Sequence, residues 1–109
     1  MTVYFNGAFV DKDEVSISPD DRGFVFGDGV YEVLRAQDGQ FFRADDHFAR
    51  LRHSLDHVRI QVDVAALRDA VRVLLPKNDL QDGPAKVYLQ ITRGAAPRQH
   101  AFPDEPTEP

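Results

Sequence analysis

The chain has 109 residues, a length that fits one domain, and its formal net charge is −5. The acidic balance argues against nucleic acid as the main partner, because neutralising phosphates requires a basic surface. No apolar run approaches the roughly 20 residues of a membrane helix, and no basic stretch leads into an apolar run as in a secretory signal. We therefore expect a cytoplasmic protein without a membrane segment. The chain contains no cysteine, which excludes structural disulfides.

Two short strands are predicted at the N-terminus, over residues 3–5 and 9–10. The Asn6-Gly7 dipeptide between them favours a tight hairpin turn. Residues 15–17 have the composition of a further extended stretch, which Ser18-Pro19 would stop.

A glycine-rich stretch, residues 22–35, follows. Gly23, Gly27 and Gly29 precede an alternating pattern in which Glu32 and Leu34 share one side of a predicted strand and Tyr31 the other. The pattern predicts a flexible turn that leads into a strand over residues 30–37. The glycines first suggest a phosphate cradle, but their spacing fits neither common phosphate-loop pattern. We therefore expect them to let the chain turn sharply and present Tyr31.

The next segments alternate between strand and helix signals. Asp38-Gly39 predicts a hairpin that returns over residues 40–43. Asp45 or Asp46 is expected to cap a helix with an apolar stripe and, beside it, a polar stripe of His47, Arg50, Ser54 and His57. A second amphipathic helix is predicted between its cap, Asp63, and Pro76.

Alternation over residues 86–92 predicts a half-buried strand, followed by a loop over residues 95–102. Residues 103–109 are rich in proline and acidic residues and are expected to form a linker or a tail. Together these elements predict an α+β domain over residues 1–102, with an antiparallel sheet and two helices on one face.

Four side chains are candidate ligand-binding groups, each with an ordinary alternative. Arg50 is either an anion clamp or the partner of Asp46 in a helix ion pair. Arg98 and His100 alternate along an extended segment and can meet a carboxylate together, or both are simply exposed. Tyr31 either presents its hydroxyl to a ligand or packs on the sheet.

A metal site is not expected. His53 and His57 have a spacing that can hold zinc, but no third ligand is near in the sequence and the glutamate of the metalloprotease motif is missing.

Three motifs in order resemble a known family: DRGFVFGDGVYEVLR (residues 21–35), DHFARL (46–51) with Ser54, and QITRGAAPRQHAFP (90–103). They are similar to the N-terminal small domain of fold-type IV pyridoxal-phosphate aminotransferases, and within that class to the D-amino-acid aminotransferases. The resemblance implies transfer of an amino group between a D-amino acid and a 2-oxo acid, with pyridoxal 5'-phosphate as cofactor. It implies a homodimer in the full-length protein.

The resemblance also implies residue roles. Tyr31, Arg98 and His100 correspond to a trap for the substrate carboxylate, in which the arginine and histidine come across a dimer interface. Arg50 corresponds to a ligand of the cofactor phosphate. The subgroup assignment depends on Arg98-Gln-His100, because the related branched-chain aminotransferases and aminodeoxychorismate lyases usually differ there.

The family's Schiff-base lysine belongs to a second, C-terminal domain, and none of Lys12, Lys77 and Lys86 stands in its context. We therefore expect this chain to be an N-terminal fragment, with no catalytic residue of its own and inactive alone. The alternatives are a fragment of a branched-chain aminotransferase or aminodeoxychorismate lyase, and a non-catalytic dimerisation module.

Overall fold

A computed structural model describes the whole chain, residues 1–109. It begins with the predicted hairpin, in which β1 (Thr2–Phe5) pairs antiparallel with β2 (Ala8–Asp11) as a separate two-stranded sheet. Asn6 and Gly7 have φ values of 48° and 89°, which is the conformation that an Asn-Gly turn favours. Two hydrogen bonds tie β1 to the end of α3, since Asn78 accepts from the Thr2 amide and donates to the Thr2 carbonyl.

The extended stretch predicted over residues 15–17 is not a strand. A 3-10 turn, η1 (Lys12–Glu14), precedes it instead. The Asp11 carboxylate accepts a hydrogen bond from the Asp13 amide at 3.0 Å, and Glu14 accepts one from the Asp11 amide at 3.2 Å. This reciprocal capping favours the turn, and no neighbouring strand pairs with the apolar residues that follow.

The glycine-rich stretch contains a short helix, α1 (Arg22–Phe26), where only a turn was expected. The Asp21 side chain caps its N-terminus by accepting from the Gly23 amide at 2.8 Å. Gly27 ends it in the left-handed conformation, with φ at 66°.

The main sheet has the order β4-β3-β5, and all its pairs are antiparallel. The elements β3 (Gly29–Gln37) and β5 (Pro84–Thr92) pair along their full length, as the alternating patterns predicted. A Cβ atom at Gly29 would lie 2.5 Å from the carbonyl oxygen of Ile91, so glycine permits this close pairing. The returning strand β4 (Gln40–Phe41) is shorter than the predicted residues 40–43 because Arg43 turns to left-handed φ, 53°, to start the next helix.

Two long helices follow, α2 (Ala44–Val58) and α3 (Val64–Lys77). The cap predicted for α2 is wrong, because Arg43 occupies the N-cap position without a side-chain hydrogen bond. Asp45 instead pairs with Arg68, and Asp46 pairs with Arg43. The cap predicted for α3 is confirmed, since Asp63 accepts a hydrogen bond from the Ala66 amide at 3.1 Å.

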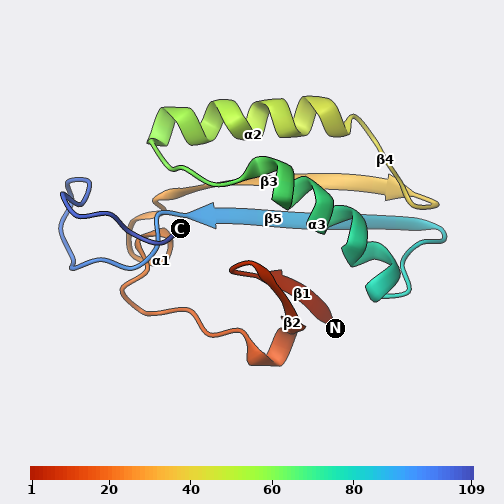
Figure 1. The fold of residues 1–109 in the computed structure, drawn as a ribbon, viewed down its shortest axis with the longest axis horizontal. Helices are drawn as coiled ribbons and strands as arrows, with labels where there is room; N and C mark the ends of the chain where they lie inside the picture. Colours follow the sequence, from red (N-terminus) through yellow and green to blue (C-terminus); the bar gives the residue numbers. More distant parts are fainter.

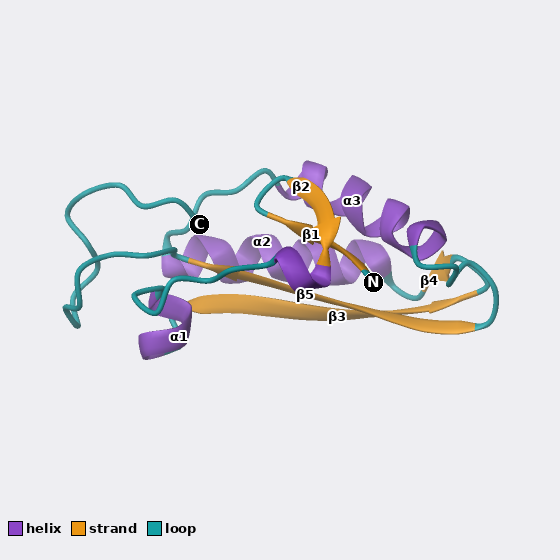
Figure 2. Cartoon of the chain, turned by 90° about the horizontal axis from the view of Figure 1, so that it is seen from below, coloured by secondary structure: helices purple, strands orange, loops and turns teal.

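Both long helices lie on the same side of β3 and β5, and the β1–β2 hairpin lies beyond α3 (Figures 1 and 2). The core forms between this face and the helices, where Leu34 and Leu51 are its largest fully buried side chains. The opposite face of the sheet is exposed, so the predicted α+β arrangement with two helices on one face is confirmed. None of the helices has the length and apolar character needed to cross a membrane.

Candidate functional site

Glu32 is a charged residue on the buried face of β3, only 3% exposed. Arg50 of α2 donates from Nε to Glu32 Oε1 at 2.6 Å and from Nη2 to Oε2 at 2.7 Å. His47, one turn earlier on α2, donates from Nδ1 to Oε2 at 2.9 Å. These three residues form the Glu32 cluster, in which both carboxylate oxygens have partners.

The ion pair between Arg50 and Asp46, which was the ordinary alternative from the sequence, does not form. Asp46 pairs with Arg43, and Arg50 pairs with Glu32. The hydrogen bonds from Arg50 hold the pKa of Glu32 below its ordinary value, outweighing burial, which acts in the opposite direction. The same bonds raise the pKa of Arg50.

Tyr31 projects from the exposed face of β3 and is 65% exposed. Its ring stacks on Tyr88 of β5, with ring centroids 5.8 Å apart and an angle of 27° between the planes. The position of Tyr31 is thus compatible with both roles considered for it, packing on the sheet and presenting its hydroxyl to a ligand. Its ring packs against a neighbour, and much of the side chain remains accessible to a ligand.

Arg98 and His100 lie in the segment of residues 95–102 that follows β5, and both are exposed. The His100 ring packs against Phe26 of α1, with centroids 5.1 Å apart. No hydrogen bond or ring contact joins either residue to Tyr31. Within one chain, Tyr31 therefore packs with Tyr88 of β5, Arg50 is paired with Glu32, and His100 packs with α1.

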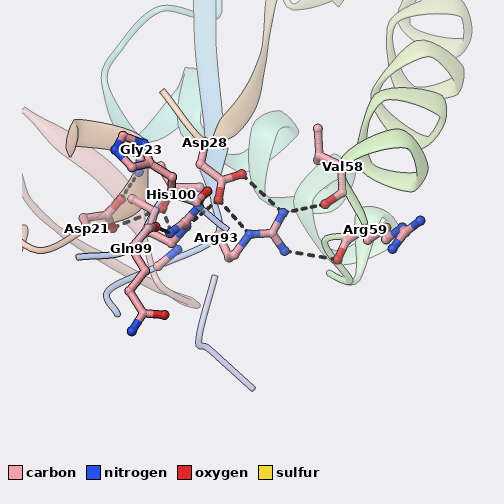
Figure 3. Close-up of polar contacts among 11 residues, drawn as sticks. Asp21, Gly23, Asp28, Val58, Arg59, Arg93, Gln99 and His100 are labelled. Atoms are coloured by element: carbon pink, nitrogen blue, oxygen red, sulfur yellow. Dashed lines mark hydrogen bonds and ion pairs between the residues drawn. The ribbon is translucent and has the colours of Figure 1, made fainter. Parts of the chain in front are cut away.

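A second group of charges, the Asp28 cluster, lies at the end of the long strands and consists of Arg22, Asp28 and Arg93 (Figure 3). Both arginines donate from Nε to Asp28 Oδ2 at 2.7 Å. Arg93 also donates to the carbonyls of Val58 and Arg59 at the end of α2, and Arg22 donates to the carbonyls of residues 99 and 100. The cluster therefore joins three segments that are far apart in the sequence.

Burial acts to raise the pKa of Asp28, but hydrogen bonds and charge from Arg93 and Arg22 outweigh it. The pKa of Asp28 is consequently lower than that of an ordinary aspartate. All three side chains are nearly inaccessible, with Arg22 at 3%, Asp28 at 7% and Arg93 at 9% exposed. The four carbonyl oxygens take up the donors that the single carboxylate cannot satisfy.

His53 and His57 lie side by side on the exposed surface of α2, with ring centroids 4.3 Å apart. His57 Nδ1 donates to the backbone carbonyl of His53 at 3.1 Å. No further acidic or histidine side chain joins them as a possible metal ligand.

Sequence reasoning missed the ion pairs that hold these residues. Glu32 gave a usable signal, because a carboxylate within the apolar alternation of a strand requires a buried partner. Asp28, Arg22 and Arg93 gave none, since their neighbours in space are up to 78 residues distant in the sequence.

Comparison with known proteins places these residues in a family. The model of the family "Amino-transferase class IV" matches residues 29–108. D-alanine aminotransferase of Staphylococcus haemolyticus is 44% identical over 109 residues, which are 98% of this chain and 38% of that protein.

Two solved structures are also similar. The 4-amino-4-deoxychorismate lyase from Pseudomonas aeruginosa matches 80% of this chain and 31% of its own, with 36% identity and a TM-score of 0.66. A hypothetical aminotransferase from Mycobacterium tuberculosis, in its alpha-ketoglutarate and PMP bound form, matches 87% of this chain and 34% of its own, with 28% identity and a TM-score of 0.75.

The chain thus spans about a third of the length of the relatives it matches. The family model, by contrast, covers most of this chain, and the fold agrees with the resemblance of its motifs. The chain belongs to the class IV aminotransferase family.

Proposed function

We propose that the protein acts as a pyridoxal-phosphate-dependent transaminase that moves an amino group between a D-amino acid and a 2-oxo acid. The observation that carries this proposal is the 44% identity with a D-alanine aminotransferase over 98% of the chain. The similar M. tuberculosis aminotransferase with PMP bound supports the cofactor. A homodimeric assembly and a cytoplasmic location remain predictions.

Arg50 fits a phosphate ligand by its geometry. An arginine carries five N–H donors in a plane, and Glu32 uses only one from Nε and one from Nη2. The bonds to buried Glu32 fix the plane of the guanidinium, while the side chain remains 66% exposed. The remaining donors can therefore meet a phosphate without breaking the ion pair, in an orientation that suits bidentate contact.

Tyr31, Arg98 and His100 are proposed to bind the substrate carboxylate. A carboxylate is well matched by one permanent cation and neutral donors, which these side chains offer. The placement of the pair on residues 98–100 apart from Tyr31 supports a trap completed by a second copy of the chain. When bound, pyridoxal phosphate supplies the electron sink that amino-group transfer requires.

The lysine that holds the cofactor in this family is proposed to lie outside residues 1–109. Lys12 and Lys86 are exposed, and the Lys77 ammonium lies 5.0 Å from the ring of Phe9, beside the N-terminal hairpin. None of the three belongs to the Glu32 cluster. We assign no catalytic residue within this chain and expect it to be inactive alone.

The test of the carboxylate assignment is Arg98→Met in the protein at its natural length, compared with Arg52→Met, an exposed arginine on α2. We expect Arg98→Met to raise KM for D-alanine by about 10- to 100-fold, as loss of a charged hydrogen bond implies. Cofactor affinity should stay unchanged in both variants, and Arg52→Met should keep the KM of the wild type. Equal KM values for both variants would exclude Arg98 from the carboxylate site.

An aminodeoxychorismate lyase is the second candidate, because a solved lyase is 36% identical over 80% of the chain. Release of pyruvate from 4-amino-4-deoxychorismate, without turnover of D-alanine, would support this alternative over the transaminase.

A further inference from the structure

The proposed function leaves α1 and the Asp28 cluster without a role, although they contain the most deeply buried arginine of the chain. Arg22 is 3% exposed, and burying a guanidinium is costly unless its donors are satisfied. The acceptors that satisfy Arg22 therefore indicate what this residue holds in place.

Three acceptors surround the Arg22 guanidinium. Its Nε donates to Asp28 Oδ2 at 2.7 Å, its Nη1 to the carbonyl of Gln99 at 2.5 Å, and its Nη2 more distantly, at 3.4 Å, to the carbonyl of His100. Figure 3 shows Gln99 and His100 on one side of Asp28, with Val58 and Arg59 on the other. Arg22 thus donates hydrogen bonds to the backbone immediately after Arg98.

The side chain of His100 is held by the same helix. The Arg22 guanidinium lies over the Phe26 ring, 4.9 Å from its centroid. The His100 ring also packs against Phe26, with 5.1 Å between the ring centroids. The Phe26 ring therefore contacts both the Arg22 guanidinium and the His100 ring. In this way α1 contacts both the carbonyl and the ring of His100.

The residues before Arg98 are anchored as well. Gly94 accepts a hydrogen bond from the Arg22 amide at 2.9 Å, and the Ala96 amide donates to the carbonyl of Asp20 at 3.3 Å. Arg98 consequently lies between two anchor points, one at residues 94–96 and the other at Gln99. Both are formed by α1 and the residues that lead into it.

We propose that Arg22 is a positioning residue for substrate binding, which fixes the backbone of Gln99 and His100 so that the flanking Arg98 and His100 side chains are preorganised for a carboxylate. This proposal rests on the proposed function, which assigns these two side chains to the substrate. Preorganisation matters here because Arg98 lies in an exposed segment, where ordering a long side chain on binding has an entropic cost.

The experiment compares Arg22→Lys with Arg93→Lys in the protein at its natural length. Lysine keeps the charge but lacks the planar fork that reaches several acceptors. Each change removes one of the two arginines from Asp28, but only Arg22 donates to the carbonyls of Gln99 and His100. Arg93 donates to the carbonyls of Val58 and Arg59 and lies over the Phe102 ring, 4.0 Å from its centroid. It donates no hydrogen bond to residues 98–100, so it controls for the loss of an arginine from Asp28.

Arg22→Lys should raise KM for D-alanine about tenfold, with kcat within about threefold of wild type and cofactor affinity unchanged. Amide hydrogen exchange over residues 95–102 should become faster in the same variant. Arg93→Lys should leave KM within about twofold and accelerate exchange near residues 58–60 and near Phe102, where Arg93 makes its contacts. A purely structural role for Arg22 would lower the active fraction, and thus kcat, without changing KM.

An unchanged KM in Arg22→Lys, or an equal change in both variants, would overturn the proposal. If Arg22→Lys does not fold, Phe26→Leu removes the ring contacts with His100 and with the Arg22 guanidinium but keeps the Arg22 side chain, and an unchanged KM there would contradict the role of α1. If the wild type shows no turnover of D-alanine, the proposed function fails. In that case unchanged exchange over residues 95–102 in Arg22→Lys would still refute the positioning role.

Discussion

At the scale of single residues, Glu32 determines how Arg50 is presented. A carboxylate buried to this degree would be unstable alone, and its partners on α2 satisfy both oxygens. The ion pair also restricts the guanidinium to one plane, which is the requirement for a phosphate ligand that must already be in place when the cofactor arrives.

Glu32→Gln tests this dependence. The amide keeps one acceptor for Arg50 but loses the charge and presents a donor where the carboxylate accepted a second bond. In the protein at its natural length, we expect the Kd for pyridoxal phosphate to rise roughly tenfold, as followed by fluorescence titration. Asp45→Asn, which weakens only the exposed pair with Arg68, serves as control and should leave the Kd unchanged. An unaltered Kd in Glu32→Gln would show that Arg50 is oriented by other groups.

The acidic limit of stability follows from Asp28 and Glu32. The folded-state pKa values of both lie below their ordinary values, so the unfolded chain binds more protons in acid. Stability from these groups is complete above the unfolded pKa values, about 4 for either residue, and is lost as pH falls through the lower folded values. Urea unfolding between neutral and acidic pH should show this decline, and a weaker decline for Asp28→Asn. The same decline in Asp28→Asn and Glu32→Gln as in wild type would assign it to other carboxylates.

At the scale of elements, the turns and strands that depend on neighbouring residues were predicted correctly from the sequence. The Asn6-Gly7 and Asp38-Gly39 turns both adopt positive φ, and the alternation in β3 and β5 placed their buried faces correctly. The prediction was wrong where contacts between distant residues determine the secondary structure, as in α1. The helix α1 contains a glycine, which disfavours helix, and is held by its caps and by Gly94, which pairs with Arg22.

The two long helices differ in how they begin, which gives a prediction for their caps. Asp63→Ala should cost about 1 kcal/mol of unfolding free energy, because Asp63 satisfies the Ala66 amide. Asp46→Ala should cost less than about 0.5 kcal/mol, since Asp46 makes only an exposed ion pair. Equilibrium urea unfolding measures both values. A larger loss for Asp46→Ala than for Asp63→Ala would mean that Asp46 caps α2 after all.

At the scale of the whole molecule, the candidate site is divided between two places. Arg50 lies on α2, paired with Glu32 of β3, and Tyr31 lies on β3, whereas Arg98 and His100 lie beyond β5. The roles of these four residues were predicted from motif resemblance rather than from local structure. Spacing alone left an ordinary alternative for each, and the ion pairs that orient them appear only in three dimensions.

The exposed face of the main sheet leaves Tyr31, Tyr88 and a cross-strand pair of like charges, Arg35 and Lys86, accessible. Like charges directly opposite each other destabilise a sheet, and this pair makes the exposed face locally positive. This arrangement agrees with a proposed active site to which residues 1–109 contribute ligands but no catalytic lysine.

The most direct test of this account is the substrate specificity of the purified protein at its natural length, with pyridoxal phosphate and 2-oxoglutarate present. We predict formation of pyruvate from D-alanine but not from L-alanine, with a KM for D-alanine about 10- to 100-fold higher in Arg98→Met and unchanged in Arg52→Met. Turnover of L-valine or of 4-amino-4-deoxychorismate, without turnover of D-alanine, would contradict the account.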